Sequence, residues 1–278
     1  MVMVVTGVAG AADSQLAEAR KLYNSTDFAQ SLKVLQAISP KDGAVYELMG
    51  RDYYMQADYK RASEAFDKAF TLEPSNAEYA LWLGRAWGRR AETSSFFTAP
   101  GQASKARQYF ERSVQLNPSN LDAQSDLFEY YLDAPGFLGG GLDRAEATAE
   151  RMSQISPADG QWAEAKLAEK RKESQTAEAH LRKAVELAPQ QVGKLIELAR
   201  FLTKQGRYQE ADQNFDRAEK VAPNSPTVIF SRASAYVEAH HNLSFARELL
   251  KRYMSMNLRP DDPPKAEAAK LLERAQGG

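Results

Sequence analysis

Few side chains in this sequence could carry out acid–base or metal chemistry, and none has the spacing that such chemistry requires. The chain has 3 histidines and no cysteine. His180 lies between apolar neighbours in a helical pattern, and His240 and His241 fall in a predicted hairpin turn before Asn242. None of the three has a second ligand at metal-binding spacing. The sequence therefore predicts surface or partly packed imidazoles, with no metal, no cofactor and no catalytic residue.

Three further patterns resemble part of a functional site without completing one. Asp261 and Asp262 precede a predicted helix, where negative charge complements the helix dipole. The glycines at 139–141 are not followed by the Lys-Ser or Lys-Thr pair of a phosphate-binding loop, and Gly7 and Gly10 lack the third glycine of a dinucleotide-binding turn. We therefore expect a protein that is not an enzyme; a catalytic cluster assembled across distant segments is the alternative.

The bulk composition is that of a folded protein without a strong overall charge. Of 278 residues, 43% are hydrophobic and 26% are charged, outside the range that predicts disorder. Lys and Arg total 36 against 37 Asp and Glu, so the net charge of -1 provides no field to attract nucleic acid or an acidic membrane. No run approaches the roughly 20 apolar residues of a membrane span. We expect no nucleic-acid partner and no membrane span.

A repeated helical pattern accounts for most of the chain. Five segments contain a small residue, a second residue four positions later, a third after three more positions, and a proline five positions beyond that. Offsets of four and three place side chains on one helical stripe, and proline ends a helix. Each segment is interpreted as the second helix of a hairpin. The positions are Ala62, Phe66, Ala69, Pro74; Ala106, Phe110, Ser113, Pro118; Ala145, Ala149, Met152, Pro157; Ala177, Leu181, Ala184, Pro189; and Ala211, Phe215, Ala218, Pro223.

Five other segments of the chain carry a complementary stripe. Its third position is usually small, which allows two helices to approach closely while larger neighbours fill the groove between them. Each of these segments is interpreted as the first helix of a hairpin. The positions are Tyr46, Met49, Gly50, Tyr53; Ala80, Leu83, Gly84, Trp87; Gln124, Leu127, Phe128, Tyr131; Leu195, Leu198, Ala199, Leu202; and Ile229, Arg232, Ala233, Tyr236.

The two stripes together resemble the tetratricopeptide repeat (TPR), a helix hairpin of about 34 residues. Residues 43–76 and 192–225 match its pattern most fully. The resemblance implies an all-α fold: a right-handed α-solenoid of about seven TPR-like hairpins with a C-terminal capping helix that covers the last apolar face. The expected parts are a leader at 1–13, repeats at 14–42, 43–76, 77–120, 121–157, 158–190, 191–225 and 226–260, and a capping helix and tail at 261–278.

The resemblance also implies a scaffold that binds a protein or peptide in a concave groove lined by the first helices. The repeat phase predicts exposed groove positions that include Glu47, Leu81, Ile196 and Thr203. Because surface ion pairs are common, the groove charges could instead neutralise one another. The predicted partner-binding residues are Arg51, Tyr54, Glu78, Arg85, Arg89, Glu129, Arg200 and Lys204; Arg90 extends the basic patch, and Asp122 and Asp133 join Glu129 in an acidic patch that faces it.

Two insertions distinguish individual repeats. Linkers expand at 91–101 and 134–142, at the same end of adjacent hairpins, and carry the apolar residues Phe96, Phe97, Phe137 and Leu138. Long loops with apolar tips are often functional, so this loop edge could contact a partner or form a pocket for a small molecule. The alternative is a local core that packs on Trp87 or Tyr131. Self-association through the end repeats is a third possibility for partners.

Residues 1–12 are apolar and end in small residues before Asp13. This composition resembles the end of a secretory signal peptide, although the positively charged start is missing. We therefore expect a periplasmic or secreted protein. The alternative is a cytoplasmic protein with a disordered or tag-derived leader.

Overall fold

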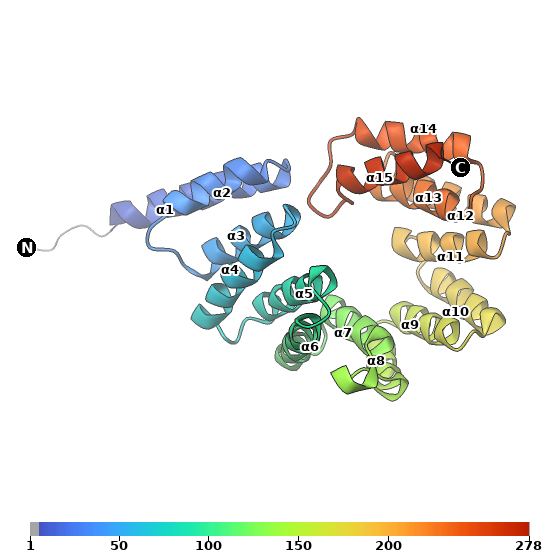
Figure 1. The fold of residues 1–278 in the computed structure, drawn as a ribbon, viewed down its shortest axis with the longest axis horizontal. Helices are drawn as coiled ribbons and strands as arrows, with labels where there is room; N and C mark the ends of the chain where they lie inside the picture. The colour runs from blue at the N-terminus through green and yellow to red at the C-terminus, as the bar shows by residue number, and fades with distance from the viewer. Residues whose placement is uncertain (1–5, 278) are drawn as a thin grey trace, which may run out of the picture. The chain divides into compact units, whose positions relative to one another are not determined.

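The protein is all-helical over the part of the chain that its computed structural model describes, residues 6–277, with side chains described from Ala12 onward. This part contains fifteen α-helices, one 3-10 helix and no strand (Figure 1). The all-α prediction is confirmed. The helices are α1 (Thr6–Asn24), α2 (Phe28–Ala37), α3 (Gly43–Met55), α4 (Tyr59–Leu72), α5 (Ala77–Thr93), α6 (Ala99–Leu116), α7 (Leu121–Asp133), η1 (Gly136–Leu138), α8 (Leu142–Ile155), α9 (Pro157–Lys170), α10 (Ser174–Leu187), α11 (Val192–Lys204), α12 (Tyr208–Val221), α13 (Pro226–Glu238), α14 (Leu243–Met254) and α15 (Lys265–Gln276).

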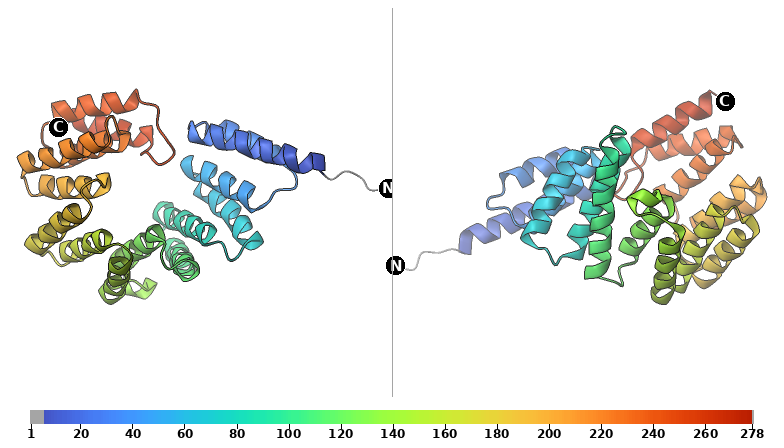
Figure 2. Two further views of the ribbon diagram at one scale, coloured as in Figure 1. Left: turned by 180° about the vertical axis from the view of Figure 1, so that it is seen from behind. Right: turned by 60° about the horizontal axis from the view of Figure 1, so that its bottom comes forward.

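The helices form two compact units, Met1–Thr148 and Ala149–Gly278, whose boundary falls within α8. In the first unit, α1 packs on α2, α3 on α4, and α5 on α6, and each hairpin also contacts the next. In the second unit, α9–α10, α11–α12 and α13–α14 pack in the same way, and α15 packs on α13 and α14. Figures 1 and 2 show the hairpins of each unit stacked in the order of the sequence. Each unit is therefore a short stack of helix hairpins.

The turn inside a regular hairpin is encoded locally. In the α3–α4 turn, Ala57 adopts a left-handed conformation with φ of 59°, and the side chain of Asp58 accepts a hydrogen bond from the backbone N–H of Arg61. Thr26 and Asp27 repeat this arrangement between α1 and α2. An N-cap carboxylate satisfies a backbone donor that the first turn of a helix leaves free. The Asp at these turns therefore fixes where each second helix begins.

The predicted stripes form the interface inside each hairpin. Phe66, Phe110 and Phe215 are all buried, with exposed fractions of 0%, 7% and 0%. A Cβ atom added at Gly84 would lie 2.6 Å from the ring of Phe110, so the glycine is what allows the ring to approach α5 so closely. The spacing of small and large residues thus sets the distance between the two helices of the hairpin.

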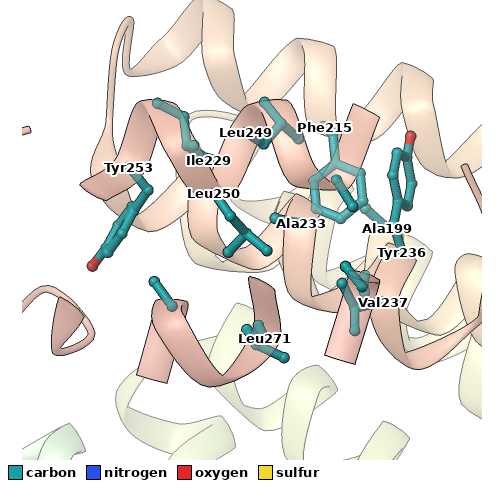
Figure 3. Close-up of a cluster of buried hydrophobic side chains, with 14 residues drawn as sticks. Ala199, Phe215, Ile229, Ala233, Tyr236, Val237, Leu249, Leu250, Tyr253 and Leu271 are labelled. Atoms are coloured by element: carbon teal, nitrogen blue, oxygen red, sulfur yellow. The ribbon is translucent and has the colours of Figure 1, made fainter. Parts of the chain in front are cut away.

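The capping helix completes the core of the second unit. Figure 3 shows Phe215 and Tyr236 at one end of this core, Tyr253 at the other, and Leu250 and Leu271 between them. Leu271 of α15 is 8% exposed, and Ala268 and Ala275 of the same helix are fully buried. Because α15 covers apolar surface on α13 and α14, the last hairpin does not leave that face in water. The predicted capping helix is confirmed.

Two predicted segments differ from the structure. Most of the expected linker at 91–101 is helical, because α5 continues to Thr93 and α6 begins at Ala99. Ala91 and Glu92 are good helix formers that extend α5, and Pro100 stands in the first turn of α6, where proline is tolerated. In the leader, residues 1–5 lie outside the described residues, and residues from Thr6 onward belong to α1. The interpretation of the leader as a signal peptide stays a prediction.

Candidate functional site

A pocket of about 540 Å³ lies among α5, α6 and α7 in the first unit. Five of the predicted site residues line it. Tyr54, Arg85, Arg89 and Glu129 come from the predicted groove, and Leu138 comes from the predicted loop edge. The two predicted sites therefore meet in one pocket, which we call the α5–α7 pocket.

An ion pair forms one side of the α5–α7 pocket. The Nε of Arg85 donates to an Oδ atom of Asp126 at 2.5 Å, and the guanidinium lies 5.0 Å from the ring centre of Trp82. The side chains of Arg85 and Asp126 remain 25% and 23% exposed. Burial raises the pKa of Asp126, and the Arg85 guanidinium opposes that rise. The pair is thus held in place and still accessible to a polar group of a ligand.

A second arginine and two tyrosines extend this side. Arg89 donates to Glu92 at 2.5 Å and to the hydroxyl of Tyr59 at 3.1 Å. The ring of Tyr54 meets the ring of Tyr59 edge-on, with centroids 5.3 Å apart. Burial raises the pKa of Tyr54 to about 12, although Arg89 opposes the shift. The Tyr54 hydroxyl therefore keeps its proton at neutral pH.

The remaining walls are mainly apolar and small. Phe110 and Leu138 contribute apolar surface, and the Tyr130 hydroxyl donates to the carbonyl of Leu138 at 3.0 Å, which fixes η1 against α7. A Cβ atom at Gly88 would meet only Ala106, at 4.0 Å. Pockets of about 300–1,000 Å³ with apolar walls and a few polar groups are typical of ligand sites. This pocket can hold a small molecule or a side chain of a bound peptide.

Arg51 and Glu78 lie outside the pocket. Arg51 forms ion pairs with Glu47 and Glu78, and its guanidinium is 4.4 Å from the ring centre of Trp82. Glu78 also accepts a hydrogen bond from the indole of Trp82 at 2.9 Å. These contacts preorganise the surface between α3 and α5 and neutralise its charges.

Three of the four arginines in the predicted basic patch form ion pairs. The carboxylates that pair with Arg51, Arg85 and Arg89 are Glu47, Glu78, Asp126 and Glu92. Of these carboxylates, Glu47 and Glu78 are among the predicted groove positions, whereas Asp126 and Glu92 are not. The neutralising charges thus come from the same or the neighbouring first helix.

Several positions predicted to be exposed in the groove are buried. Glu47, Leu81, Ile196 and Thr203 have exposed fractions of 5%, 0%, 5% and 1%. A first helix contacts its own second helix as well as neighbouring hairpins, as α3 does with α2, α4 and α5. Only a narrow strip of such a helix remains in water, so the repeat phase alone overestimates the exposed surface.

Arg200 and Lys204 line a separate pocket in the second unit. This pocket, of about 340 Å³, lies between α11 and α13 and includes Tyr208 and Glu238. Arg200 forms an ion pair with Glu197, with a guanidinium nitrogen 3.9 Å from a carboxylate oxygen. The ring of His241 stacks on Tyr208 with centroids 3.5 Å apart, which is the packed imidazole that the sequence predicts. The pocket is smaller and more polar in character than the α5–α7 pocket.

The predicted loop edge does not form a buried core. Phe96, Phe97 and Phe137 are 85%, 91% and 81% exposed, so the expected packing on Trp87 or Tyr131 is wrong for these rings. Phe96 and Phe97 contact each other with centroids 6.0 Å apart. Leu138 is half-buried and turns toward the α5–α7 pocket. The loop edge therefore contributes one side chain to the pocket and three exposed rings beside it.

Sequence reasoning missed Asp126, which holds Arg85. Helices α3, α5 and α7 begin at Gly43, Ala77 and Leu121, so Asp126 occupies the position of Leu48 and Trp82 in the two preceding first helices. Both of those residues are buried. A carboxylate at a position that is apolar in the two preceding first helices was the signal available in the sequence.

Neither a metal site nor a membrane span is found where the structure is described. Within residues 12–277, no cluster of three or more histidine and carboxylate side chains is arranged to hold a metal ion. No helix in the described part is both long and apolar enough to cross a membrane. His180 lies within hydrogen-bonding distance of Gln161, with its Nδ1 2.8 Å from the amide oxygen.

Stacked helix hairpins with a small-to-large interlock define the class of helical repeat proteins. Residues 195–225 match the family model of the tetratricopeptide repeat. Solved structures of this family have the same fold. A tetratricopeptide repeat protein of Parabacteroides merdae is 13% identical, with a TM-score of 0.60 over 96% of this chain and 99% of its own. The chain therefore has the fold of tetratricopeptide repeat proteins, and residues 195–225 match one such repeat.

Two further solved structures share this fold. A thermophilic TPR protein of Thermus thermophilus is 17% identical, with a TM-score of 0.53 over 73% of this chain and 99% of its own. The human IFIT1 dimer with PPP-AAAA is 18% identical, with a TM-score of 0.54 over 76% of this chain and 55% of its own. A search of curated proteins finds no match.

Proposed function

We propose that this protein is a non-enzymatic scaffold that binds a protein or peptide, and that the α5–α7 pocket receives part of the bound chain. The observation that carries the proposal is the convergence of Tyr54, Arg85, Arg89, Glu129 and Leu138 on one pocket. Binding along the first helices is the usual mode of stacked hairpin repeats. The pocket lies at the ends of two such helices, α5 and α7.

The walls favour a side chain with an apolar stem and a polar end. Phe110 and Leu138 offer apolar contact, while the exposed parts of Arg85 and Asp126 offer a donor and an acceptor. Both charges are already paired, so an entering polar group exchanges hydrogen bonds without leaving an isolated charge in the pocket. A bound chain thereby gains affinity from buried apolar area and orientation from the ion pair.

A pair of substitutions at Gly88 tests the proposal. Gly88→Ala adds a Cβ with ordinary contact to Ala106, whereas Gly88→Phe places a ring in the pocket. We expect affinity capture from the native extract to recover the same partner with the wild type and with Gly88→Ala, and to lose it with Gly88→Phe. Circular dichroism of each variant serves as the control for folding. A partner that is retained by a folded Gly88→Phe variant would contradict the proposal.

A triple variant separates the pocket from the rest of the first-helix surface. Alanine at Arg51, Arg85 and Arg89 removes cations both inside and outside the pocket. Alanine at Arg51 alone leaves the pocket lining unchanged. We expect the triple variant to lose the partner and the single variant to retain most of the binding. Equal losses would assign recognition to the surface between α3 and α5 instead of the pocket.

A small-molecule ligand in the same pocket is the second candidate function. A volume of about 540 Å³ is sufficient for a compact organic molecule. Native mass spectrometry of protein purified from its own extract distinguishes the two candidates, because a small ligand adds a discrete mass that Gly88→Phe removes. A third possibility, self-association through the end repeats, predicts a mass that rises with protein concentration in sedimentation experiments.

We also propose that the protein acts outside the cytoplasm, in the periplasm or as a secreted protein. The apolar residues 1–12 with their small-residue end support this proposal. Fractionation of the native cells with an antibody to the protein tests it. Recovery with the cytoplasmic fraction would favour the alternative location.

A further inference from the structure

The ends of two adjacent hairpins carry three phenyl rings that no other part of the fold covers. Phe96 and Phe97 lie in the α5–α6 turn, and Phe137 lies in η1 after α7. Their exposed fractions of 85%, 91% and 81% are the largest among the exposed large hydrophobic residues of the described chain. Ala91 and Pro135 line the same pocket, so the two turns belong to one edge of the first unit. We call these three rings the aromatic edge.

Both turns of the aromatic edge are free of charge. No ionisable residue occurs between Glu92 and Lys105, or between Asp133 and Asp143. The other turns within hairpins contain at least one ionisable residue at 25–27, 56–58, 171–173, 205–207 and 239–242. Removing a charge from water is costly, whereas an uncharged turn with phenyl rings gains free energy in an apolar environment. Among the turns within hairpins, these two are the ones that combine exposed phenyl rings with an absence of charge, which suits them to leave water.

Much of the backbone of the two turns is already hydrogen-bonded internally. The N–H groups of Thr98 and Ala99 donate to the carbonyl of Ser95 at 3.0 Å in both cases. In the second turn, the N–H of Gly139 donates to Gly136 at 2.9 Å, and the N–H of Gly141 donates to Tyr131 at 2.8 Å. Unpaired backbone groups are what makes entry of irregular segments into a lipid environment unfavourable. This cost is reduced in both turns.

Two cations lie directly beside the first turn. Arg90 and Lys105 stack against Trp87, each 4.1 Å from the centre of its ring system. In the part of the chain that the structure describes, Arg90 bonds to the hydroxyl of Ser63 and neither cation forms an ion pair. Glu92 is paired with Arg89, so this end of the hairpin has a net positive charge. The second turn is bordered by Asp133 and Asp143, so the attraction for anions belongs to the first turn.

We propose that the aromatic edge docks the protein on an anionic lipid surface, with the phenyl rings of Phe96, Phe97 and Phe137 entering the interface and with Arg90 and Lys105 at the level of the headgroups. Exposed apolar patches mark either protein or membrane contacts. Three rings that protrude from two separate turns, without an enclosing pocket of their own, match a flat deformable layer better than a single partner cavity. Local cations beside apolar side chains supply the two components of peripheral membrane binding.

Co-sedimentation with vesicles tests the docking directly. The probes are vesicles of phosphatidylcholine alone and vesicles of equal parts phosphatidylcholine and phosphatidylglycerol. We expect the intact protein to bind the anionic vesicles and to bind the neutral ones several-fold more weakly. The double variant Phe96→Ser, Phe97→Ser should lose about tenfold or more of the partitioning, because each phenyl that leaves water contributes on the order of a tenfold factor.

Matched variants distinguish docking from a general effect on folding. Leu72→Ser removes another exposed apolar side chain, 54% exposed at the end of α4 and away from the turn within its hairpin. It should bind anionic vesicles as the wild type does. The double variant Arg90→Gln, Lys105→Gln should narrow the difference between the two vesicle compositions several-fold, since each cation near an anionic surface contributes about a fivefold factor. Circular dichroism should be unchanged in the phenylalanine variants, whose rings are exposed.

Three outcomes would overturn the proposal. One is the absence of binding by the intact protein to either vesicle composition. Another is unchanged binding by the folded Phe96→Ser, Phe97→Ser variant. The third is a role of the rings in protein contact alone, seen when the same variant loses a captured protein or a dimer and keeps its vesicle binding. The proposal is independent of the ligand of the α5–α7 pocket, because Gly88→Phe should leave vesicle binding intact.

Discussion

The α11–α12 and α5–α6 hairpins share one internal frame and differ at the turn. Helices α11 and α12 contain 13 and 14 residues, whereas α5 and α6 contain 17 and 18. In both hairpins a small residue of the first helix, Ala199 or Gly84, lies at the same position, eighth in its helix. The additional residues of the longer hairpin are all at the turn end. Buried contacts therefore fix the middle of a hairpin, whereas its turn end is free to be extended.

Phenylalanine residues in the two hairpins lie in opposite environments. Phe215 of the regular hairpin is 0% exposed, and Phe97 of the extended one is 91% exposed. Phe215 belongs to the packed interior that both hairpins share, and Phe97 belongs to a surface that the longer of the two hairpins adds. Stability and binding should therefore depend on different phenylalanines.

The largest expected effect is that of Phe215→Ala. Truncating a fully buried phenyl ring should reduce the free energy of unfolding by about 3–5 kcal/mol, because apolar burial is lost and a cavity remains. Phe97→Ala should change it by less than about 0.5 kcal/mol, as exposed substitutions do. Denaturant unfolding of the two variants measures both. Similar losses for the two rings would show that the extended turn is part of the core.

A buried carboxyl in α3 should give the next largest effect. Asp52 is the tenth residue of its helix, where α5 and α11 have the buried Ala86 and Phe201. Its Oδ2 accepts a hydrogen bond from the hydroxyl of Ser31 at 2.6 Å. Burial raises its pKa to about 7, and the hydrogen bond from Ser31 opposes the shift. The carboxyl is therefore easiest to keep in the fold when it is protonated.

Asp52→Asn should remove this pH dependence. Since the folded pKa lies above the unfolded value of 3.8, the wild type loses stability as pH rises from about 4 through about 7. The amide keeps an acceptor for Ser31 and carries no charge, so the variant should be more stable by about 2–4 kcal/mol near pH 8 and little changed near pH 4. Unfolding midpoints across this range test the prediction. A variant that is destabilised at every pH would contradict it.

The hairpin interior and the regular turns could be predicted from the sequence because their signals are local. The spacing of Gly84, Phe110 and their equivalents recurs in several hairpins, and the Asp at a turn specifies its own helix start. The helical ends of the 91–101 segment were missed, since a run that contains Ser94, Ser95 and Phe96 resembles a loop of the same length. Where α5 ends and α6 begins is decided by the packing of the two helices on each other, which the local sequence does not specify.

The site was predictable in part for a similar reason. Tyr54, Arg85 and Arg89 follow from the repeat phase, which places them on the first-helix surface. Their partners depend on which side chains of the next hairpin come near, as Asp126 does for Arg85. The burial of Leu81 likewise depends on contacts between hairpins. The periodic pattern of the sequence does not predict which side chains of one hairpin contact those of the next.

Replacing either of two glycines of α5 with alanine should change the free energy of unfolding by a smaller amount, and in opposite directions. A Cβ at Gly84 would meet the Phe110 ring at 2.6 Å, so Gly84→Ala should cost about 1–3 kcal/mol through overpacking. Gly88→Ala, one turn later, meets only Ala106 at 4.0 Å and should stabilise the helix by up to about 1 kcal/mol. Thermal unfolding of the pair measures the difference. Equal effects of the two substitutions, or a larger loss of stability for Gly88→Ala, would show that the Phe110 ring does not approach α5 closely at Gly84.

The smallest effect is expected for an exposed ion-pair network between α10 and α12. Arg207 pairs with Glu178 and Glu210 on the outer surface of these helices. Arg207→Ala should shift the unfolding midpoint no more than a typical surface ion pair does, and the shift should vanish at high salt. A large shift that persists in salt would assign the network a structural role equal to that of the hairpin core.

Site-specific photo-crosslinking tests most directly whether the extended end of the α5–α6 hairpin is the binding site. A photoreactive amino acid is placed at Glu92, on the rim of the α5–α7 pocket, or at Lys183, exposed on α10. In the native extract, the account predicts a crosslinked partner from position 92, absent when Gly88→Phe is added, and none from position 183. A partner captured from position 183 and not from position 92 would contradict it.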